Sequence, residues 1–199
     1  MKSATSNVIR VLSGALLAGF FIFVASLLYI RCSEKWVGAL FFSLGLLVIL
    51  VFKFPLFTGT VGYVRKPRQI PAQIIYLVGN LIGCLPALLF ECPQEIIENK
   101  LSQPWYQMLV MSIVCGMLIY TAVEGFHQSK PWLTIIAVAG FVLVGAEHCI
   151  ADWCFLLMSR KFTIELVWFL PIIVVGNICG AQLMRAVTQP APVIVVEKV

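Results

Sequence analysis

Gly79-Asn80-Leu81-Ile82-Gly83 and Gly176-Asn177-Ile178-Cys179-Gly180 are two copies of one signature, with Asn177 placed 97 residues after Asn80. Each copy follows a long apolar stretch that polar residues interrupt, at 53–59 in the first half and at 145–152 in the second. Two such halves indicate an internal repeat of about three helices each. An odd number of spans inverts the second copy relative to the first, and broken helices in such proteins form substrate sites near the bilayer midplane.

Composition places the chain in the membrane class. It is 61% hydrophobic and 12% charged, with a mean hydropathy of +0.99 over 199 residues. A soluble domain of this length has too little interior for so much apolar sequence, so the solvent is expected to be lipid. Residues 1–199 are therefore predicted to be one all-α transmembrane domain. The sequence holds no phosphate-binding glycine loop, nucleophile elbow or zinc-binding helix, and its seven cysteines lack metal spacing. We expect no enzyme activity, no metal and no cofactor.

Six apolar stretches are long enough to span a bilayer, for which about 20 residues suffice. The second and fifth are longer than the others and contain the polar interruptions. Unwound backbone at that depth is tolerated only where protein buries it or where it lines a wet cavity. We therefore predict two broken helices, with repeat one at about 8–92 and repeat two at about 104–187. The predicted stretches are 8–30, 37–64, 70–90, 105–126, 132–158 and 164–184.

The basic residues predict the orientation of the chain. Lysine and arginine gather on the cytoplasmic side of membrane proteins. One predicted side carries Lys2, Arg10, Arg65, Lys66, Arg68, Lys130, Arg185 and Lys198. The opposite side carries Arg31, Lys35, Lys100, Arg160 and Lys161, diluted by five glutamates. Both termini are therefore predicted to be cytoplasmic. The same rule explains the net charge of +5, so we do not read that charge as nucleic-acid binding.

Ionisable residues at membrane depth are candidates for function. Glu147 and His148 stand together in an apolar context. Imidazole, with an ordinary pKa of about 6.5, can exchange a proton near neutral pH. Asp152 follows His148 by four residues, which places both on one face of a helix. We expect Glu147 to pin the break by accepting backbone donors. The alternative is a buried His148 that only bridges two helices.

Several motifs together resemble the formate–nitrite transporter family over nearly the whole chain. In order, they are Leu56–Gly59, Gly79-Asn80, Glu147–Asp152 and Gly176–Gly180. The resemblance implies an aquaporin-like protomer of six transmembrane helices with inverted three-helix repeats, assembled in the bilayer as a homopentamer with one pore per protomer. It implies transport of small monovalent anions such as formate, nitrite or hydrosulfide, together with protons. A prokaryotic plasma (inner) membrane is the expected location.

The resemblance also implies roles for single residues. His148 matches the central histidine of the pore. Leu56, Phe57 and Thr58 match the loop that breaks the second helix and faces this histidine. Phe42 and Leu46 match one apolar constriction, and Phe141 matches the other. Asn177 matches a late asparagine near the pore, and Lys100 a cation of the vestibule. Glu147, Asp152 and Asn80 are expected to support the pore.

The chain also departs from the family pattern. Lys53 stands where a glycine is usual and Pro55 where an acidic residue is usual. Asp152 and Gly116 each occupy a position that is often asparagine. Two other readings stay open, an aquaporin-like pore for neutral solutes and a membrane scaffold without transport. Flux measurements with anions and neutral solutes would separate the three.

Overall fold

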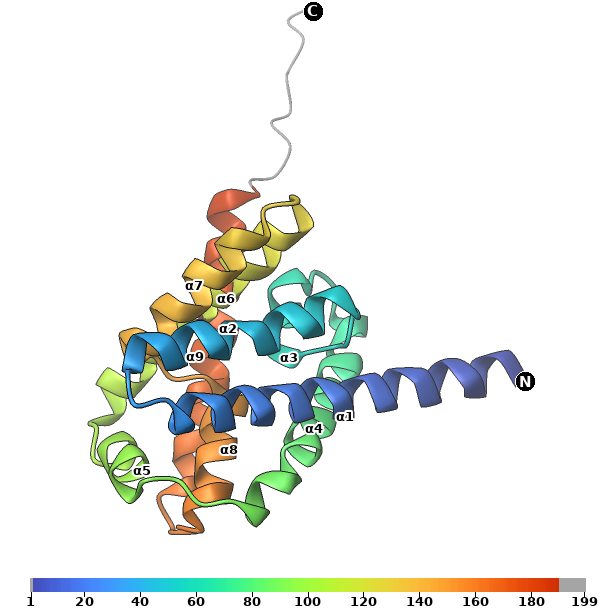
Figure 1. Cartoon of the computed structure of the whole chain (residues 1–199). Coiled ribbons are helices and arrows are strands. Elements are labelled where there is room, and N and C mark those ends of the chain that lie inside the picture. Colours follow the sequence, from blue (N-terminus) through green and yellow to red (C-terminus); the bar gives the residue numbers. More distant parts are fainter. Residues whose placement is uncertain (1, 190–199) are drawn as a thin grey trace, which may run out of the picture.

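The computed structural model describes residues 2–189, with side chains from residue 8 onward, and it contains helices and no strands within that range. Lys198, counted above with the cytoplasmic charges, and the side chain of Lys2 lie outside the described part. The α-helices are α1 (Lys2–Arg31), α2 (Lys35–Val51), α3 (Phe57–Thr60), α4 (Ile70–Gly83), α5 (Gln94–Leu101), α6 (Trp105–His127), α7 (Pro131–Leu143), α8 (Cys149–Ser159) and α9 (Leu166–Thr188) (Figure 1). Three short 3₁₀ segments are η1 (Val61–Tyr63), η2 (Pro67–Gln69) and η3 (Leu85–Leu89).

The helices agree with the predicted spans, including the two breaks. Four segments in the described part are long and apolar enough to cross a membrane alone, at Val8–Arg31, Pro67–Leu89, Trp105–His127 and Leu166–Thr188. The second predicted span is α2 followed by the short α3, and the fifth is α7 followed by α8. Neither α2, α7 nor α8 is long enough alone, because about 20 residues are needed.

Both broken helices end with the same hydrogen-bond pattern. In the first, the N–H of Lys53 bonds to Leu50 O and the N–H of Phe54 to Ile49 O. In the second, Gly145 and Ala146 make the same bonds to Val142 O and Phe141 O. This is a Schellman motif, in which the first residue beyond the helix adopts a left-handed conformation. That residue is Gly145 (φ 70°) in the second break and Lys53 (φ 57°) in the first.

The two Gly-Asn signatures bring helices together in equivalent ways. A Cβ atom on Gly19 of α1 would lie 1.9 Å from the carbonyl oxygen of Asn80 in α4. A Cβ atom on Gly116 of α6 would lie 2.3 Å from the carbonyl oxygen of Asn177 in α9. Only glycine permits such close backbones, as is common between membrane helices. Gly116, which stands where the family often has asparagine, is therefore a packing residue. Its counterpart 97 positions earlier in the chain is Gly19.

The broken helices pack against these two helix pairs, which are α1 with α4 and α6 with α9. The α2 helix packs on α1 and α7, and α6 packs on α7 and α9. The short α8 helix contacts α1, α4, α5, α9 and η3, and nearly all of its residues are buried. Both polar interruptions therefore lie within the protein, where their backbone groups need partners from other helices.

Candidate functional site

Thr58 and His148, one from each helix break, meet in the centre of the protein. The Thr58 hydroxyl oxygen lies 2.8 Å from Nε2 of His148, and both side chains are buried. Thr58 is in α3, just after the first break, and His148 precedes α8, just after the second. The structure thus joins two residues that belong to motifs in different halves of the chain.

The hydrogen bonds of His148 assign its tautomer. Nδ1 accepts the backbone N–H of Ala151 at 3.1 Å, so the imidazole is the N-cap of α8. A neutral ring that accepts at Nδ1 carries its hydrogen on Nε2. Nε2–H therefore donates to the Thr58 oxygen, and the Thr58 hydroxyl hydrogen is left to donate elsewhere. The pair can thus present a hydroxyl donor to a passing ligand while His148 stays neutral.

Asn80 holds the first break in place. Its side-chain carbonyl accepts the N–H of Phe57 at 2.8 Å, and this N–H opens the short helix α3. Its amide nitrogen donates to Pro55 O within the break at 3.1 Å and to Ala15 O of α1 at 2.8 Å. The first N–H groups of a helix have no partner within that helix. Asn80 supplies one such partner, the acceptor for the N–H of Phe57.

Asn177 does the same for the second break. It accepts the N–H of Cys149 at 3.0 Å and donates to Glu147 O at 2.8 Å and to Ser112 O of α6 at 2.9 Å. The family resemblance predicts that Asn177 lies near the pore. The structure places it behind the break instead, because its buried amide is fully occupied by backbone groups.

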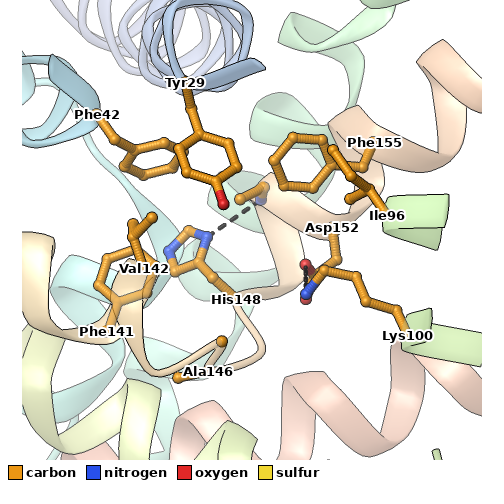
Figure 2. Close-up of a pocket in the computed structure, with 12 residues that line it drawn as sticks. Tyr29, Phe42, Ile96, Lys100, Phe141, Val142, Ala146, His148, Asp152 and Phe155 are labelled. Carbon is orange, nitrogen blue, oxygen red and sulfur yellow. Dashed lines mark hydrogen bonds and ion pairs between the residues drawn. The ribbon is translucent and has the colours of Figure 1, made fainter. Parts of the chain in front are cut away.

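Two cavities lie beside the residues that form this contact. The cavity that His148 lines, here called the Lys100 cavity, has a volume of about 80 Å³, enough for several water molecules. The cavity that the chain neighbours of Thr58 line, the Lys53 cavity, has a volume of about 350 Å³. The Lys100 cavity is lined by Tyr29, Phe42, Ile96, Lys100, Phe141, Val142, Gly145, Ala146, His148, Ala151, Asp152 and Phe155 (Figure 2). The Lys53 cavity is lined by Leu46, Ile49, Leu50, Lys53, Phe54, Pro55, Leu56, Gly59, Thr60, Tyr63, Val123, Phe126 and His127.

Apolar side chains separate the cavities. Phe141 stacks on the ring of His148 at 5.7 Å between centroids, and Phe42 meets Phe141 edge-on at 5.6 Å. We expected Phe42 and Leu46 in one constriction and Phe141 in the other. The structure instead pairs Phe42 with Phe141 beside the Lys100 cavity and places Leu46 with Leu56 at the Lys53 cavity. Residues four apart on a helix differ in height by about 6 Å, so Phe42 and Leu46 reach different cavities.

Phe57 does not face either of these cavities. It lines an apolar cavity between α4 and α9, with Leu77 and Ile178 among its neighbours there. The prediction that Phe57 belongs to the pore loop is therefore wrong about its side chain. Neighbouring residues of a helical turn point in different directions. Leu56 therefore lines the Lys53 cavity and Thr58 reaches His148, while Phe57 faces the cavity between α4 and α9.

Lys100 is held by two carboxylates. Its Nζ lies 2.6 Å from Glu147 Oε2 and 2.9 Å from Asp152 Oδ1, and only 14% of its side chain is exposed. Burial acts to lower the pKa of Lys100, but Asp152 and Glu147 outweigh it and raise that pKa above its ordinary value. Lys100 thus lines this cavity as a paired cation.

The structure corrects the role expected of Glu147. Its oxygens accept from Lys100 and, at 3.0 Å, from the side-chain amide of Gln103. They were expected to accept backbone donors, but in the second break the side-chain oxygen of Asn177 accepts the backbone N–H of Cys149. A buried carboxylate is stabilised best by a cation, which backbone groups cannot supply.

Some residues that line the cavities were not singled out from the sequence. Tyr29 lines the Lys100 cavity, and Tyr63 and His127 line the Lys53 cavity. Tyr63 also donates a hydrogen bond of 2.8 Å to Glu124. These residues come near the ends of predicted spans, where interfacial anchors also occur, so no sequence signal separated them. In the part of the chain that the structure describes, no three His, Cys, Asp or Glu residues gather to hold a metal ion.

Comparisons with known proteins agree on one family. The family model described as "Formate/nitrite transporter" matches residues 1–189. The formate channel FocA of Haemophilus influenzae is 24% identical over 173 residues, which are 70% of this chain and 61% of that protein. FocA of Escherichia coli K12 is 24% identical over 187 residues, 75% of this chain and 66% of that protein. The chain thus spans less than two thirds of the length of these relatives.

Solved structures show the same fold. A structure described as "Pentameric formate channel with formate bound" matches with a TM-score of 0.75 at 21% identity, over 93% of this chain and 97% of that one. A structure described as "FNT family ion channel" matches with a TM-score of 0.77 at 16% identity, over 93% and 90% of the chains. Both resemblances concern the arrangement of the helices.

Proposed function

The chain belongs to the formate/nitrite transporter family, and on that premise we propose that it carries small monovalent weak-acid anions, of the formate, nitrite or hydrosulfide class, through the path between the Lys100 and Lys53 cavities. The family is one of transport proteins and not of enzymes. Together with the apolar helices, this makes the protein an integral membrane protein.

The observation that carries the proposal is the hydrogen bond between Thr58 and His148. His148 lines the Lys100 cavity, and the chain neighbours of Thr58 line the Lys53 cavity. A bare anion that leaves water for an apolar constriction loses several kcal/mol or more, and a neutral acid loses far less. Phe42 and Phe141 form such a constriction. A hydroxyl donor inside it stabilises an anion or a carbonyl oxygen without offering a full charge that would trap it.

The names of relatives support the substrate class. FocA of two bacteria and one solved pentamer are named formate channels. The neutral-solute pore is the second reading, and the apolar lining of Leu46 and Leu56 is compatible with it. A scaffold without transport is disfavoured by the Lys100 and Lys53 cavities, since helix packing requires no cavities.

Assembly and topology are part of the proposal. We propose a homopentamer with a pore in each protomer, supported by the pentameric relative and by apolar side chains that α4 and α9 expose, such as Ile74 and Val175. We propose inverted repeats at about 8–92 and 104–187, supported by the equivalent contacts of Asn80 and Asn177. Both termini would lie in the cytoplasm of a prokaryotic plasma (inner) membrane.

The orientation can be tested by cysteine labelling. The chain has seven cysteines, of which Cys179 is exposed and Cys32 partly so. In a background with serine at both positions, Lys66→Cys should react only from the cytoplasm and Glu91→Cys only from outside. The reverse pattern would overturn the proposed orientation.

The function is tested with the purified protein in liposomes. Uptake of formate, nitrite and hydrosulfide should exceed that of water and glycerol, relative to protein-free vesicles. Preferential flux of water or glycerol would support the neutral-solute pore, and absence of all flux would support the scaffold.

A further inference from the structure

The charges beside His148 do not balance. Lys100, Glu147 and Asp152 form one cluster with a single cation and two carboxylic groups. Both carboxyl groups are almost fully buried, at 0% and 1% exposed. An unpaired charge is costly to bury, so a site of this kind is stabilised when it takes up a proton. Asp152 creates the imbalance, since asparagine at this position would leave Lys100 and Glu147 as a neutral pair.

The hydrogen bonds distinguish the two carboxyl groups. Glu147 is occupied at both oxygens, by Lys100 and by Gln103. Asp152 is occupied at Oδ1 by Lys100, whereas Oδ2 is buried and has no partner among the described residues. Asp152 also lines the Lys100 cavity, close to His148 (Figure 2). A hydrogen on Oδ2 would convert this unused acceptor into a donor beside the place where an anion enters.

We propose that Asp152 is the proton-carrying group of this protein, and that it gives its proton to a weak-acid anion in the Lys100 cavity. The O–H bond at Oδ2 breaks, and an O–H bond (S–H for hydrosulfide) forms on the anion, which becomes the neutral acid. The electron pair stays on Asp152, whose carboxylate is held by Lys100. A proton from the bulk solution, relayed by water in the cavity, then returns to Oδ2. This inference rests on the proposed transport of weak-acid anions.

The other ionisable groups that face Asp152 are less suited to this step. They are Lys100 from α5, Glu147 and His148 from the break, Tyr29 from α1, Cys115 from α6 and Cys149 from α8 itself. Lys100 already keeps its proton as the ion-pair partner of Glu147. Phenol and thiol groups keep their protons at neutral pH. His148 accepts at Nδ1 from Ala151 and donates at Nε2, so protonation would break the cap of α8.

The sequence permits a direct test of the proton on Asp152. Asp152 is the only aspartate in the chain. Cell-free synthesis with aspartate labelled by ¹³C at the side-chain carboxyl therefore gives one signal from one residue, in infrared or solid-state NMR spectra of the protein in liposomes. At neutral pH we expect the signal of a protonated acid, which changes to that of a carboxylate in alkaline buffer. A carboxylate signal at neutral pH would overturn the proposal.

Transport measurements test the transfer itself. Formate uptake and proton uptake are recorded together in liposomes at clamped voltage. The parent should take up about one proton per formate, and Asp152→Asn should lose that coupling, whereas Asp152→Glu should restore it. Glu98→Gln is the matched control, because it removes one negative charge from an exposed side chain paired with Lys161 and leaves the cluster intact.

The outcomes separate this inference from the proposed function. A parent that carries no weak-acid anion would defeat both. A parent that carries formate, together with an Asp152→Asn variant whose proton coupling is unchanged, would overturn the role of Asp152 alone. Gel filtration of each variant establishes that the assembly is retained before coupling is compared.

Discussion

Thr58 and His148 are 90 positions apart in the chain, yet their side chains lie 2.8 Å apart and form the contact between the two helix breaks. Each is oriented by its own half of the protein. Asn80 holds the turn that carries Thr58, and Asn177 holds the turn that carries His148. The distance between the pair therefore depends on the packing of both halves.

Removal of the Thr58 hydroxyl should impair transport without unfolding the protein. In Thr58→Val, Nε2–H of His148 loses its acceptor and the path loses its hydroxyl donor. A buried donor without a partner costs about 1–3 kcal/mol. We expect anion flux in liposomes to fall by tenfold or more. Thr134→Val is the matched control, because that buried hydroxyl bonds Ala122 O between α6 and α7. Equal flux losses in the two variants would indicate a general packing defect.

His148→Asn should keep the fold, because asparagine is a good N-cap and can replace Nδ1 as the acceptor for Ala151. It removes the aromatic stack on Phe141 and the donor to Thr58, so flux should fall. The pH profile of flux should keep its shape, since His148 stays neutral in the proposed mechanism. A profile that flattens in the variant would assign proton handling to His148.

His148→Phe should be more severe. The phenyl ring fills the space of the imidazole but cannot cap α8, and loss of a cap costs about 1 kcal/mol. It also removes every polar atom of the side chain from the constriction. We expect flux close to that of protein-free liposomes, with a correctly sized assembly by gel filtration. Flux near that of the parent would exclude a polar role for residue 148.

Asn80→Ala and Asn177→Ala should destabilise the protein by similar amounts. Each leaves a buried backbone N–H and two carbonyl groups without their partner. A buried polar group without a partner costs about 1–3 kcal/mol, so each variant should lower the free energy of unfolding by several kcal/mol. Thermal unfolding in detergent measures the effect. A large loss for one variant and none for the other would contradict the equivalence of the two breaks.

Lys53→Gly should stabilise the first break. Lys53 adopts φ 57°, and a left-handed conformation costs a residue with a Cβ atom about 1 kcal/mol. Ser129→Gly, at φ 61°, should give a similar gain in thermal stability. Lys53 lines its cavity as a cation, so only Lys53→Gly should also lower anion flux at low salt. Unchanged flux in both variants would exclude a role for Lys53 in collecting anions.

Lys100→Ala should act mainly on stability. It leaves Glu147 and Asp152 buried without their cation, and removal of one partner of a buried ion pair costs about 3–5 kcal/mol. Because Lys100 is largely buried, salt should change the effect little. The triple variant Lys100→Met, Glu147→Gln, Asp152→Asn should recover most of the lost thermal stability. A purely salt-dependent fall in flux would indicate that Lys100 acts as an exposed charge.

The sequence determined the class of the protein, its helix breaks and the residues that meet there. Long apolar runs in a chain of 199 residues require lipid. Polar interruptions within two of them, followed by Gly-Asn signatures, located the breaks correctly. Such features can be read because they depend on local composition, and the motifs around Thr58 and His148 resemble those of one family.

Only the tertiary structure decided which groups become partners. Asn177 was expected near the pore, and its amide holds the second break. Lys100 was expected as a vestibule cation, and it is paired with Glu147 and Asp152. Phe42 and Phe141 were expected in different constrictions and touch one another. These outcomes depend on how helices distant in sequence rotate and pack. In a membrane interior each buried polar group is stabilised by whichever partner that packing brings within reach, and spacing along the chain does not encode this choice.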